Sequence, residues 1–272
     1  MATTQQDRAL AFRALHDPAA PLRLLNAWDA GSAKVLAAAG APALGTTSAG
    51  VAFALGLPDG ERLTRDAMLA AVAAIASAVE VPVSADLEAG YDDARETVTR
   101  ALAAGAVGFN LEDGRADGTL TPLDEQLARV RAARAAVDAS DVPAAFLNAR
   151  TDTVWLGTGD ESETVARVRA YAQAGADGVF VPGLKDPNLI ARLVTTVRDA
   201  GATLNVLAVP GLPPVAGLAT LGIARVSTGS GPARAALSTL HAAATELLTA
   251  GTYGAATAGT LSWADLNAMM AG

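Results

Sequence analysis

The sequence has no cysteine, two lysines, two histidines and only 4% aromatic residues. Without cysteine, disulfides, zinc–thiolate sites, iron–sulfur clusters and a thiol nucleophile are excluded. No apolar run reaches the ~18 residues of a membrane-spanning helix, and the first residues lack the charged-then-apolar pattern of a signal peptide. Acidic residues outnumber Lys and Arg by 28 to 20, with no basic cluster to bind nucleic acid. We therefore expect a cytoplasmic protein that binds neither membranes nor nucleic acid.

A βα pattern repeats eight times in these 272 residues, of which 51% are hydrophobic. Short strand-like runs end in polar residues or Gly, and an Ala-rich segment of helical period follows each. The predicted strands are 22–29, 43–48, 81–88, 108–113, 144–152, 178–183, 203–210 and 223–229. The predicted helices are 31–39, 64–79, 93–104, 122–138, 161–174, 186–200, 213–221 and 231–250, with a last one near 262–270. Four Ala-Gly-Ala junctions precede strands, as expected where Gly ends a helix.

This alternation predicts a parallel sheet, because each crossover between parallel strands needs a helix. Eight units in ~250 residues match a closed (β/α)₈ (TIM) barrel of the α/β class. An open doubly wound sheet usually carries a Gly-rich fingerprint after its first strand, and residues 29–32 (Asp-Ala-Gly-Ser) do not match it. We expect one domain over 1–272, with an N-terminal helix over 1–20 and a tether with a C-terminal helix over 251–272.

Active sites of such barrels lie at the carboxyl ends of the strands. Residues i and i+2 of a strand share a face, so Asp86 and Glu88 point the same way, and Glu112 ends the next strand. Three carboxylates converging there need a cation, and oxygen ligands without His or Cys suit Mg²⁺ or Mn²⁺. Arg150 remains to hold a substrate carboxylate or phosphate. The alternative is that these acids are solvated or are ion-pair partners of Arg150.

Other candidates are weaker. His16 and His241 lie away from the strand ends, so we expect structural or solvent-facing roles and no histidine base. A Schiff-base lysine is not expected either, since no predicted strand contains a lysine. The side chains expected to form pocket walls are Phe53, Trp155 and Asn205.

Five segments at the predicted strand ends resemble the isocitrate lyase/phosphoenolpyruvate mutase superfamily over about residues 20–235. These segments are Ser84-Ala85-Asp86-Leu87-Glu88-Ala89-Gly90-Tyr91, Asn110-Leu111-Glu112-Asp113, Asn148-Ala149-Arg150-Thr151-Asp152, Thr46-Thr47-Ser48-Ala49-Gly50 and Gly56-Leu57-Pro58-Asp59. The resemblance implies a (β/α)₈ barrel whose eighth helix is exchanged between partners in a homodimer or homotetramer. It also implies a small 2-oxo acid substrate and an enolate or oxyanion intermediate.

The same resemblance assigns roles to individual positions. It implies that Asp86 binds Mg²⁺ directly and that Asp59, Glu88 and Glu112 act mostly through water. It places the substrate carboxylate at Arg150 and at backbone N–H groups near Thr47, Ser48 and Ala49. On this basis we expect catalytic roles for Asp59, Glu112 and Arg150, and substrate binding by Thr47, Ser48, Ala49, Asp86, Arg150 and Asn205.

Two positions depart from the family pattern. Many members carry Asp where Glu88 stands here. Members that cleave isocitrate or methylisocitrate have a gating loop with a catalytic cysteine after the position of Glu112. The corresponding loop here, residues 113–120, is short and contains no Cys, His or Lys.

Three hypotheses about the function follow. The first is a Mg²⁺-dependent lyase, hydrolase or decarboxylase acting on an oxaloacetate-like acid; the others are a phosphonate mutase or hydrolase, and a 2-oxo-acid-binding protein without efficient catalysis.

Overall fold

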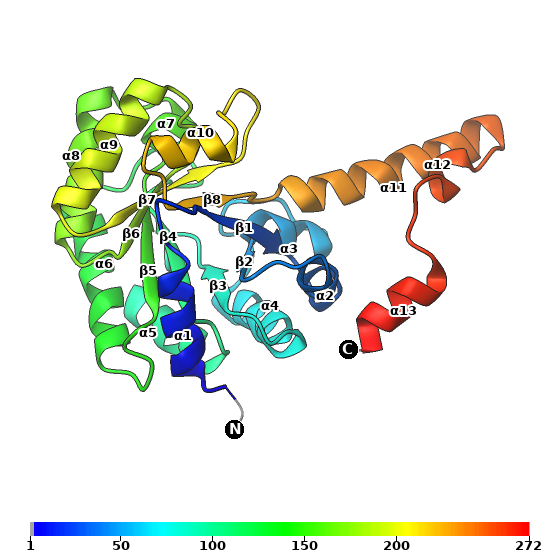
Figure 1. Cartoon of the computed structure of the whole chain (residues 1–272), viewed down its shortest axis with the longest axis horizontal. Helices are drawn as coiled ribbons and strands as arrows, with labels where there is room; N and C mark the ends of the chain where they lie inside the picture. Colours follow the sequence, from blue (N-terminus) through cyan, green and yellow to red (C-terminus); the bar gives the residue numbers. More distant parts are fainter. Residues whose placement is uncertain (1–2, 272) are drawn as a thin grey trace.

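The computed structural model describes residues 3–271 and shows a closed barrel of eight parallel strands in sequence order (Figure 1). The strands are β1 (Leu22–Ala27), β2 (Leu44–Thr46), β3 (Val83–Asp86), β4 (Gly108–Glu112), β5 (Phe146–Arg150), β6 (Gly178–Val181), β7 (Thr203–Leu207) and β8 (Arg225–Ser227). Each lies within a predicted strand. Because β1 also pairs with β8, the sheet has no free edge. The predicted (β/α)₈ barrel is confirmed.

The helices surround the barrel and match the predicted segments closely. They are α2 (Ala30–Ala38), α4 (Arg65–Ala78), α5 (Ala94–Ala103), α6 (Leu123–Asp138), α8 (Glu161–Gln173), α9 (Pro187–Asp199) and α10 (Val215–Thr220). In α9 the buried residues Ile190, Leu193, Val194 and Val197 have the spacing of one helical face. At the Ala-Gly-Ala junctions, Gly40, Gly105, Gly175 and Gly201 have φ of 91°, 96°, 104° and 80°. This left-handed backbone turns the chain into the next strand.

Three short helices are not in the predicted pattern. They are α3 (Ser48–Ala54), α7 (Thr153–Leu156) and α12 (Gly254–Thr257). Each has at most two turns, too few for a hydrophobic period to show. The last lies in the expected tether, where the Glu246 carboxylate accepts hydrogen bonds from Gly254 N and Ala255 N. The segment after residue 250 is therefore folded back rather than extended.

The N-terminal helix α1 (Gln5–Ala14) closes the lower end of the barrel. The His16 ring stacks on Phe146 with 3.9 Å between ring centroids, and Phe12 packs edge-on against His16 at 4.8 Å. Gly108 leaves the space for Phe12, because a Cβ at this position would lie 2.7 Å from the Phe12 ring. His16 is buried and structural, in agreement with the prediction.

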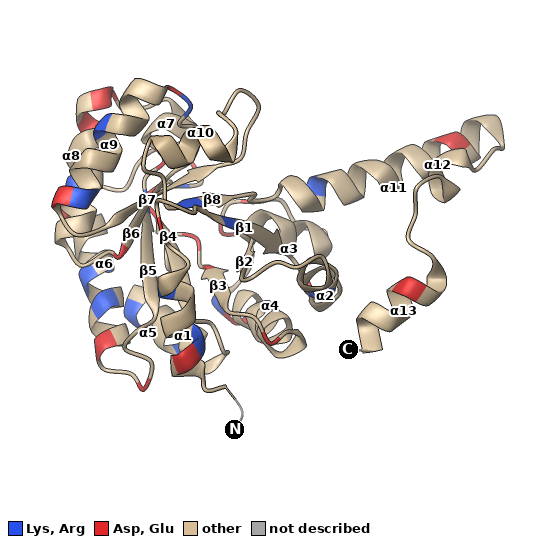
Figure 2. Cartoon of the chain, in the orientation of Figure 1, with Lys and Arg blue, Asp and Glu red and all other residues tan. Residues whose placement is uncertain are grey.

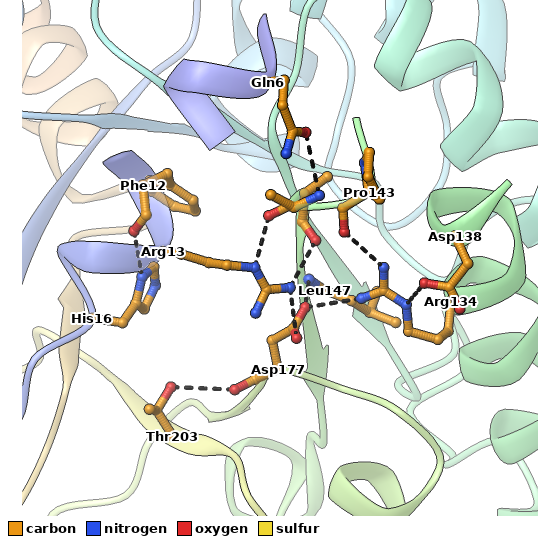
Figure 3. A network of polar contacts seen from close by, with 12 residues as sticks. Gln6, Phe12, Arg13, His16, Arg134, Asp138, Pro143, Leu147, Asp177 and Thr203 are labelled. Atoms are coloured by element: carbon orange, nitrogen blue, oxygen red, sulfur yellow. Dashed lines mark hydrogen bonds and ion pairs between the residues drawn. The ribbon is translucent and has the colours of Figure 1, made fainter. Parts of the chain in front are cut away.

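Asp177, which precedes β6, fixes this helix in place (Figure 3). Its carboxylate accepts a hydrogen bond from Leu147 N at 2.8 Å. It also forms ion pairs with Arg13 at 2.7 Å and with Arg134 at 3.1 Å. Because one partly buried carboxylate serves two arginines and a strand N–H, this is a network rather than an isolated surface pair.

The last helix of the βα pattern, α11 (Gly231–Ala250), projects away from the barrel (Figure 1). Of its side chains only Ala233 is buried. Residues 231–271 contain just three charged side chains, Arg234, Glu246 and Asp265 (Figure 2). Helix α13 (Trp263–Ala271) returns toward α2 of the same barrel, where Lys34 Nζ donates a hydrogen bond to the Met270 carbonyl. Within residues 3–271 no helix has the length and apolar character to cross a membrane.

The burial of His16 predicts a stability that depends on pH. Its pKa is lowered from 6.5 to about 3, mainly by burial and in part by the nearby Arg225 charge. The folded protein therefore holds a neutral imidazole between these values, while the unfolded chain binds a proton. We expect His16 to reduce the free energy of unfolding by up to about 1.4 kcal/mol per pH unit as pH falls from 6.5 toward 3.

Urea unfolding of the wild type, His16→Gln and His241→Gln between pH 4 and pH 8 measures this effect. His16→Gln should flatten the pH dependence below pH 6.5. His241 is exposed, so His241→Gln should keep the slope of the wild type. Equal slopes for all three proteins would show that His16 does not titrate differently in the folded state.

Candidate active site

A cavity of about 270 Å³ opens at the carboxyl ends of the strands. It is lined by side chains from most of the barrel, including Asn26, Thr47, Ser48, Ala49, Asp59, Asp86, Asn110, Arg150, Trp155, Phe180 and Arg234. Most of the predicted site residues therefore meet in one place, as the rule for such barrels requires. Glu88 and Glu112 line an adjoining hollow of about 390 Å³, which shares Asp59, Arg150 and Trp155 with the cavity.

Asp86, the last residue of β3, is held by one oxygen only. Its Oδ2 accepts hydrogen bonds from Ser48 N at 2.9 Å and from Ser48 Oγ at 2.8 Å. Thr46 Oγ1 accepts a hydrogen bond from the Asp86 N–H at 2.8 Å, which fixes the backbone. The other oxygen, Oδ1, is buried and has no hydrogen-bond partner among residues 3–271. A buried carboxylate oxygen of this kind needs a cation or a donor from a ligand.

The loop after β2 offers fewer free N–H groups than the family resemblance implied. Thr47 N donates to the Ala27 carbonyl, and Ser48 N donates to Asp86. Of the three expected substrate-binding N–H groups, these two are already bonded within the protein. Ala49 alone remains with a free N–H in this part of the described chain.

Arg150, the last residue of β5, is surrounded by acids. Its Nη1 pairs with Glu112 Oε2, and its Nε donates to Asp152 Oδ1 at 2.7 Å. The guanidinium also lies over the Phe180 ring, with 5.6 Å to the centroid. Within residues 3–271 Nη2 forms neither a hydrogen bond nor an ion pair, so this nitrogen of Arg150 is available for a ligand. The alternative that Glu112 is an ion-pair partner of Arg150 thus holds for this pair.

The short loop after β4 is anchored from below by Asp113, which is fully buried. Asp113 accepts hydrogen bonds from Tyr171 Oη at 2.6 Å, Arg167 Nη1 at 3.1 Å and Asp152 N at 2.8 Å. Gly114 packs directly on Asp152, because a Cβ there would lie 2.4 Å from Asp152 Oδ2. Asp113 therefore positions Asp152, which in turn positions Arg150.

Glu88 lies in a strained part of the chain. Glu61, Glu88 and Tyr91 all have left-handed backbone, with φ of 55°, 51° and 58°. Glu61 N donates to the Glu88 carboxylate, and Tyr91 N donates to Glu61 Oε1 at 3.1 Å. Non-Gly residues in this region are strained, and such strain concentrates at functional sites. Burial raises the pKa of Glu88 to about 8, and the charge of Asp86 adds to the shift.

The predicted convergence of carboxylates around a metal is only partly observed. Among residues 3–271 no group of three or more His, Cys, Asp or Glu side chains forms a ready metal site. Glu112 is paired with Arg150, and Glu88 with the Glu61 N–H. Burial is the main cause of the raised pKa of Asp59, Glu88 and Glu112, and the Asp86 charge contributes to all three, so the four acids are neighbours.

A single direct ligand is nevertheless compatible with Mg²⁺, which keeps several waters and needs only one or two carboxylates. Asp86 Oδ1 fits that role, because it is buried, unpartnered and part of an oxygen-only donor set. The neighbouring acids Asp59, Glu88 and Glu112 line the cavity or the adjoining hollow.

Two of the residues that were expected to line the cavity lie elsewhere. Asn205 is buried below the cavity, where it accepts a hydrogen bond from Ser227 Oγ at 3.4 Å. Phe53 lines a surface hollow beside His241 instead. Trp155 does line the cavity. The sequence analysis assigned no role to Asn110 or to the N-terminal end of α11 around Arg234. Asn110 was nevertheless recognisable as a polar residue that faces inward from β4.

Comparisons with known proteins agree with this geometry. The family model described as "Phosphoenolpyruvate phosphomutase" matches residues 12–248. The chain is 31% identical over 242 residues to the oxaloacetate decarboxylase of Chromohalobacter salexigens, covering 84% of this chain and 82% of the relative. A crystal structure from Burkholderia cenocepacia, provisionally named a lyase/mutase, is 42% identical with a TM-score of 0.91, covering 98% and 97% of the two chains. A phosphonopyruvate hydrolase bound to oxalate and Mg²⁺ is 25% identical with a TM-score of 0.84, covering 97% and 95%.

The buried anchor of the short loop predicts a large loss of stability on removing Asp113. Asp113→Ala removes the acceptor of the buried Tyr171 hydroxyl and of the Asp152 N–H, together with one of the two carboxylates paired with Arg167, and should lower the free energy of unfolding by about 3 kcal/mol or more. The matched control is Asp117→Ala in the same loop, where the side chain is exposed. It should change stability by no more than about 0.5 kcal/mol. Chemical denaturation measures both, and similar losses would contradict the role given to Asp113.

Proposed function

The chain belongs to the isocitrate lyase/phosphoenolpyruvate mutase superfamily of enzymes, and on this premise we propose that it is a Mg²⁺-dependent decarboxylase or carbon–carbon lyase acting on a small 2-oxo acid of the oxaloacetate type. One observation carries the proposal. Asp86 presents a buried, unpartnered oxygen to a cavity that Arg150 and Ala49 also line. A divalent cation there would stabilise negative charge on the 2-oxo oxygen of a substrate.

The residues of this chain suit a reaction that needs charge stabilisation more than a strong base. In decarboxylation the C3–C4 bond of oxaloacetate breaks, CO₂ leaves, and the electron pair moves onto the C2 oxygen to give the enolate of pyruvate. A proton then adds at C3. Arg150 Nη2 and the Ala49 N–H are placed to bind the substrate carboxylate. We assign the proton transfer to Asp59, a wall residue whose burial raises its pKa.

The loop after β4 argues against the isocitrate and methylisocitrate cleavages of the same superfamily. It forms a tight turn in which Gly114 bridges Leu120 and Arg115 N donates to the Thr119 carbonyl. Arg115 itself is pinned to Glu125 at 2.8 Å. The loop thus supplies neither a thiol nor a free cation to the cavity. This also weakens the phosphonate alternative, which would need a free cation such as Arg115 to bind the phosphoryl group.

The proposal predicts Mg²⁺-dependent turnover that requires Asp86. An NMR screen of oxaloacetate, other 2-oxo acids, 2-hydroxy diacids and phosphonopyruvate should show pyruvate forming from oxaloacetate faster than in the buffer with Mg²⁺ alone. Asp86→Ala should reduce turnover by at least about 100-fold, and chelation of the metal should do the same.

The control is Asp92→Ala, since Asp92 follows the same strand but is exposed and pairs only with Arg65. This variant should retain the activity of the wild type. Full activity of Asp86→Ala would reject the site. Phosphate release from phosphonopyruvate without oxaloacetate turnover would favour the phosphonate reading, and ligand binding without any product would favour the binding protein.

We also propose that α11 packs against a second copy of the chain, as the family resemblance implied. This helix is about 30 Å long by the usual rise per residue, and it exposes Leu240 and Leu248 by 65% and 84%. Exposed apolar surface on this scale is typical of an association face.

Light scattering tests this assembly. The wild type should have at least twice the 27.2 kDa mass of one chain. Leu240→Glu combined with Leu248→Glu should shift the protein toward the monomer. Leu10→Glu is the control, because Leu10 is a half-exposed leucine on α1 at the far end of the barrel. A monomeric wild type would overturn the proposal.

A further inference from the structure

Arg225 is a buried cation in the middle of the barrel. It begins β8, is 1% exposed and is the largest fully buried side chain among the described residues. Its Nη2 reaches across the barrel to Asn110 Oδ1 on β4, at 3.3 Å. Within residues 3–271 it forms no ion pair, and Nε and Nη1 have no hydrogen-bond partner. Packing alone does not explain such a residue, because a buried charge without a contacting carboxylate costs several kcal/mol.

The surroundings of Arg225 are polar. Its register partner on β7 is Asn205, and Ser84, Asn148 and Asn205 also have buried side-chain atoms without a hydrogen-bond partner. Asp86 and Asn110, which are register partners on β3 and β4, line the cavity. Burial lowers the pKa of Arg225 to about 9, and the Asp86 charge opposes that shift, so the two groups interact.

Arg225 determines which way the Asn110 amide points. Asn110 Oδ1 accepts hydrogen bonds from Asn148 Nδ2 at 2.9 Å and from Arg225 Nη2. A guanidinium can only donate. A flipped Asn110 would set its NH₂ group against that obligate donor, whereas Asn148 could adapt by flipping its own amide. The oxygen of Asn110 must therefore face Arg225, and the NH₂ group is left for the cavity.

The Asn110 NH₂ group is free to bind a ligand. Nδ2 makes no hydrogen bond to any other residue in the range 3–271, although the side chain is 94% buried and lines the cavity. It lies beside Asp86, whose Oδ1 is also unpartnered. The Asn110 NH₂ group is a hydrogen-bond donor, and the neighbouring Asp86 carboxylate favours a bound cation. Both features suit a ligand oxygen that carries negative charge.

We propose that Asn110 is a substrate-binding residue whose NH₂ group donates to an anionic oxygen of the substrate, a carboxylate or enolate oxygen, on the cavity floor. Arg225 is the positioning residue that fixes this donor through Asn110 Oδ1. The identity of the ligand as a small 2-oxo acid rests on the proposed function. The orientation of Asn110 does not, because it follows from contacts within the protein.

Calorimetric titration with oxalate, a planar dianion with two carboxylates, tests the pair in the presence of Mg²⁺. Asn110→Ala should weaken oxalate binding about tenfold or more, the usual effect of losing a hydrogen bond to a charged group. Arg225→Met should weaken it in the wild-type background but add little in the Asn110→Ala background. Arg225→Lys, which keeps an obligate donor, should restore part of the loss. Ser84→Ala is the control, since Ser84 is a buried polar residue of β3 outside the cavity lining, and it should leave oxalate affinity unchanged.

Equal effects of Arg225→Met in both backgrounds would show that Arg225 acts on the fold alone and would overturn the pairing. Unchanged oxalate affinity in Asn110→Ala, or no oxalate binding by the wild type, would overturn the role of Asn110. Should Arg225→Met not fold, Arg225→Lys and Asn110→Asp provide the comparison, since Asn110→Asp keeps the acceptor but loses the donor. The readout is binding, so a protein that binds oxalate through Asn110 but turns over no 2-oxo acid would contradict the proposed function alone.

Discussion

The ion pairs of Arg150 with Glu112 and Asp152 hold the mouth of the barrel together. They join the ends of β4 and β5, and Asp113 extends the chain of contacts downward to Arg167 on α8. Because the guanidinium is shared between two acids, neither carboxylate is free to follow a ligand. The N-terminal end of α11 and the loop after β7 complete the cavity wall.

At Asp86 and Asn110 the constraint is different. Asp86 is fixed through one oxygen by Ser48, and Asn110 is fixed through its oxygen by groups below it. In both residues the atom that faces the ligand is the one that the protein leaves unpaired. Preorganisation of this kind lowers the reorganisation needed when negative charge develops on a substrate.

The sequence was sufficient for the fold because eight βα units leave little choice of topology. It also located Asp86, Glu88, Glu112 and Arg150, since polar residues at the ends of adjacent parallel strands must meet. It could not show which of these acids would pair with Arg150, because that depends on rotamers selected by Gly114, Asp152 and the buried Asp113. Asn205 was misplaced for a similar reason: an inward-facing residue can lie one layer below the cavity.

The cavity wall contains no sulfur atom, and the chain has no thiol anywhere. Carboxylates, amides and guanidinium groups are inert toward peroxide, whereas thiolates and thioethers are its usual protein targets. The chemistry at the strand ends is therefore immune to the oxidative inactivation that limits thiol-dependent enzymes. Oxidisable side chains do occur at Trp155 in the cavity wall and at Met68, which packs with Val51 and Ala52 of α3.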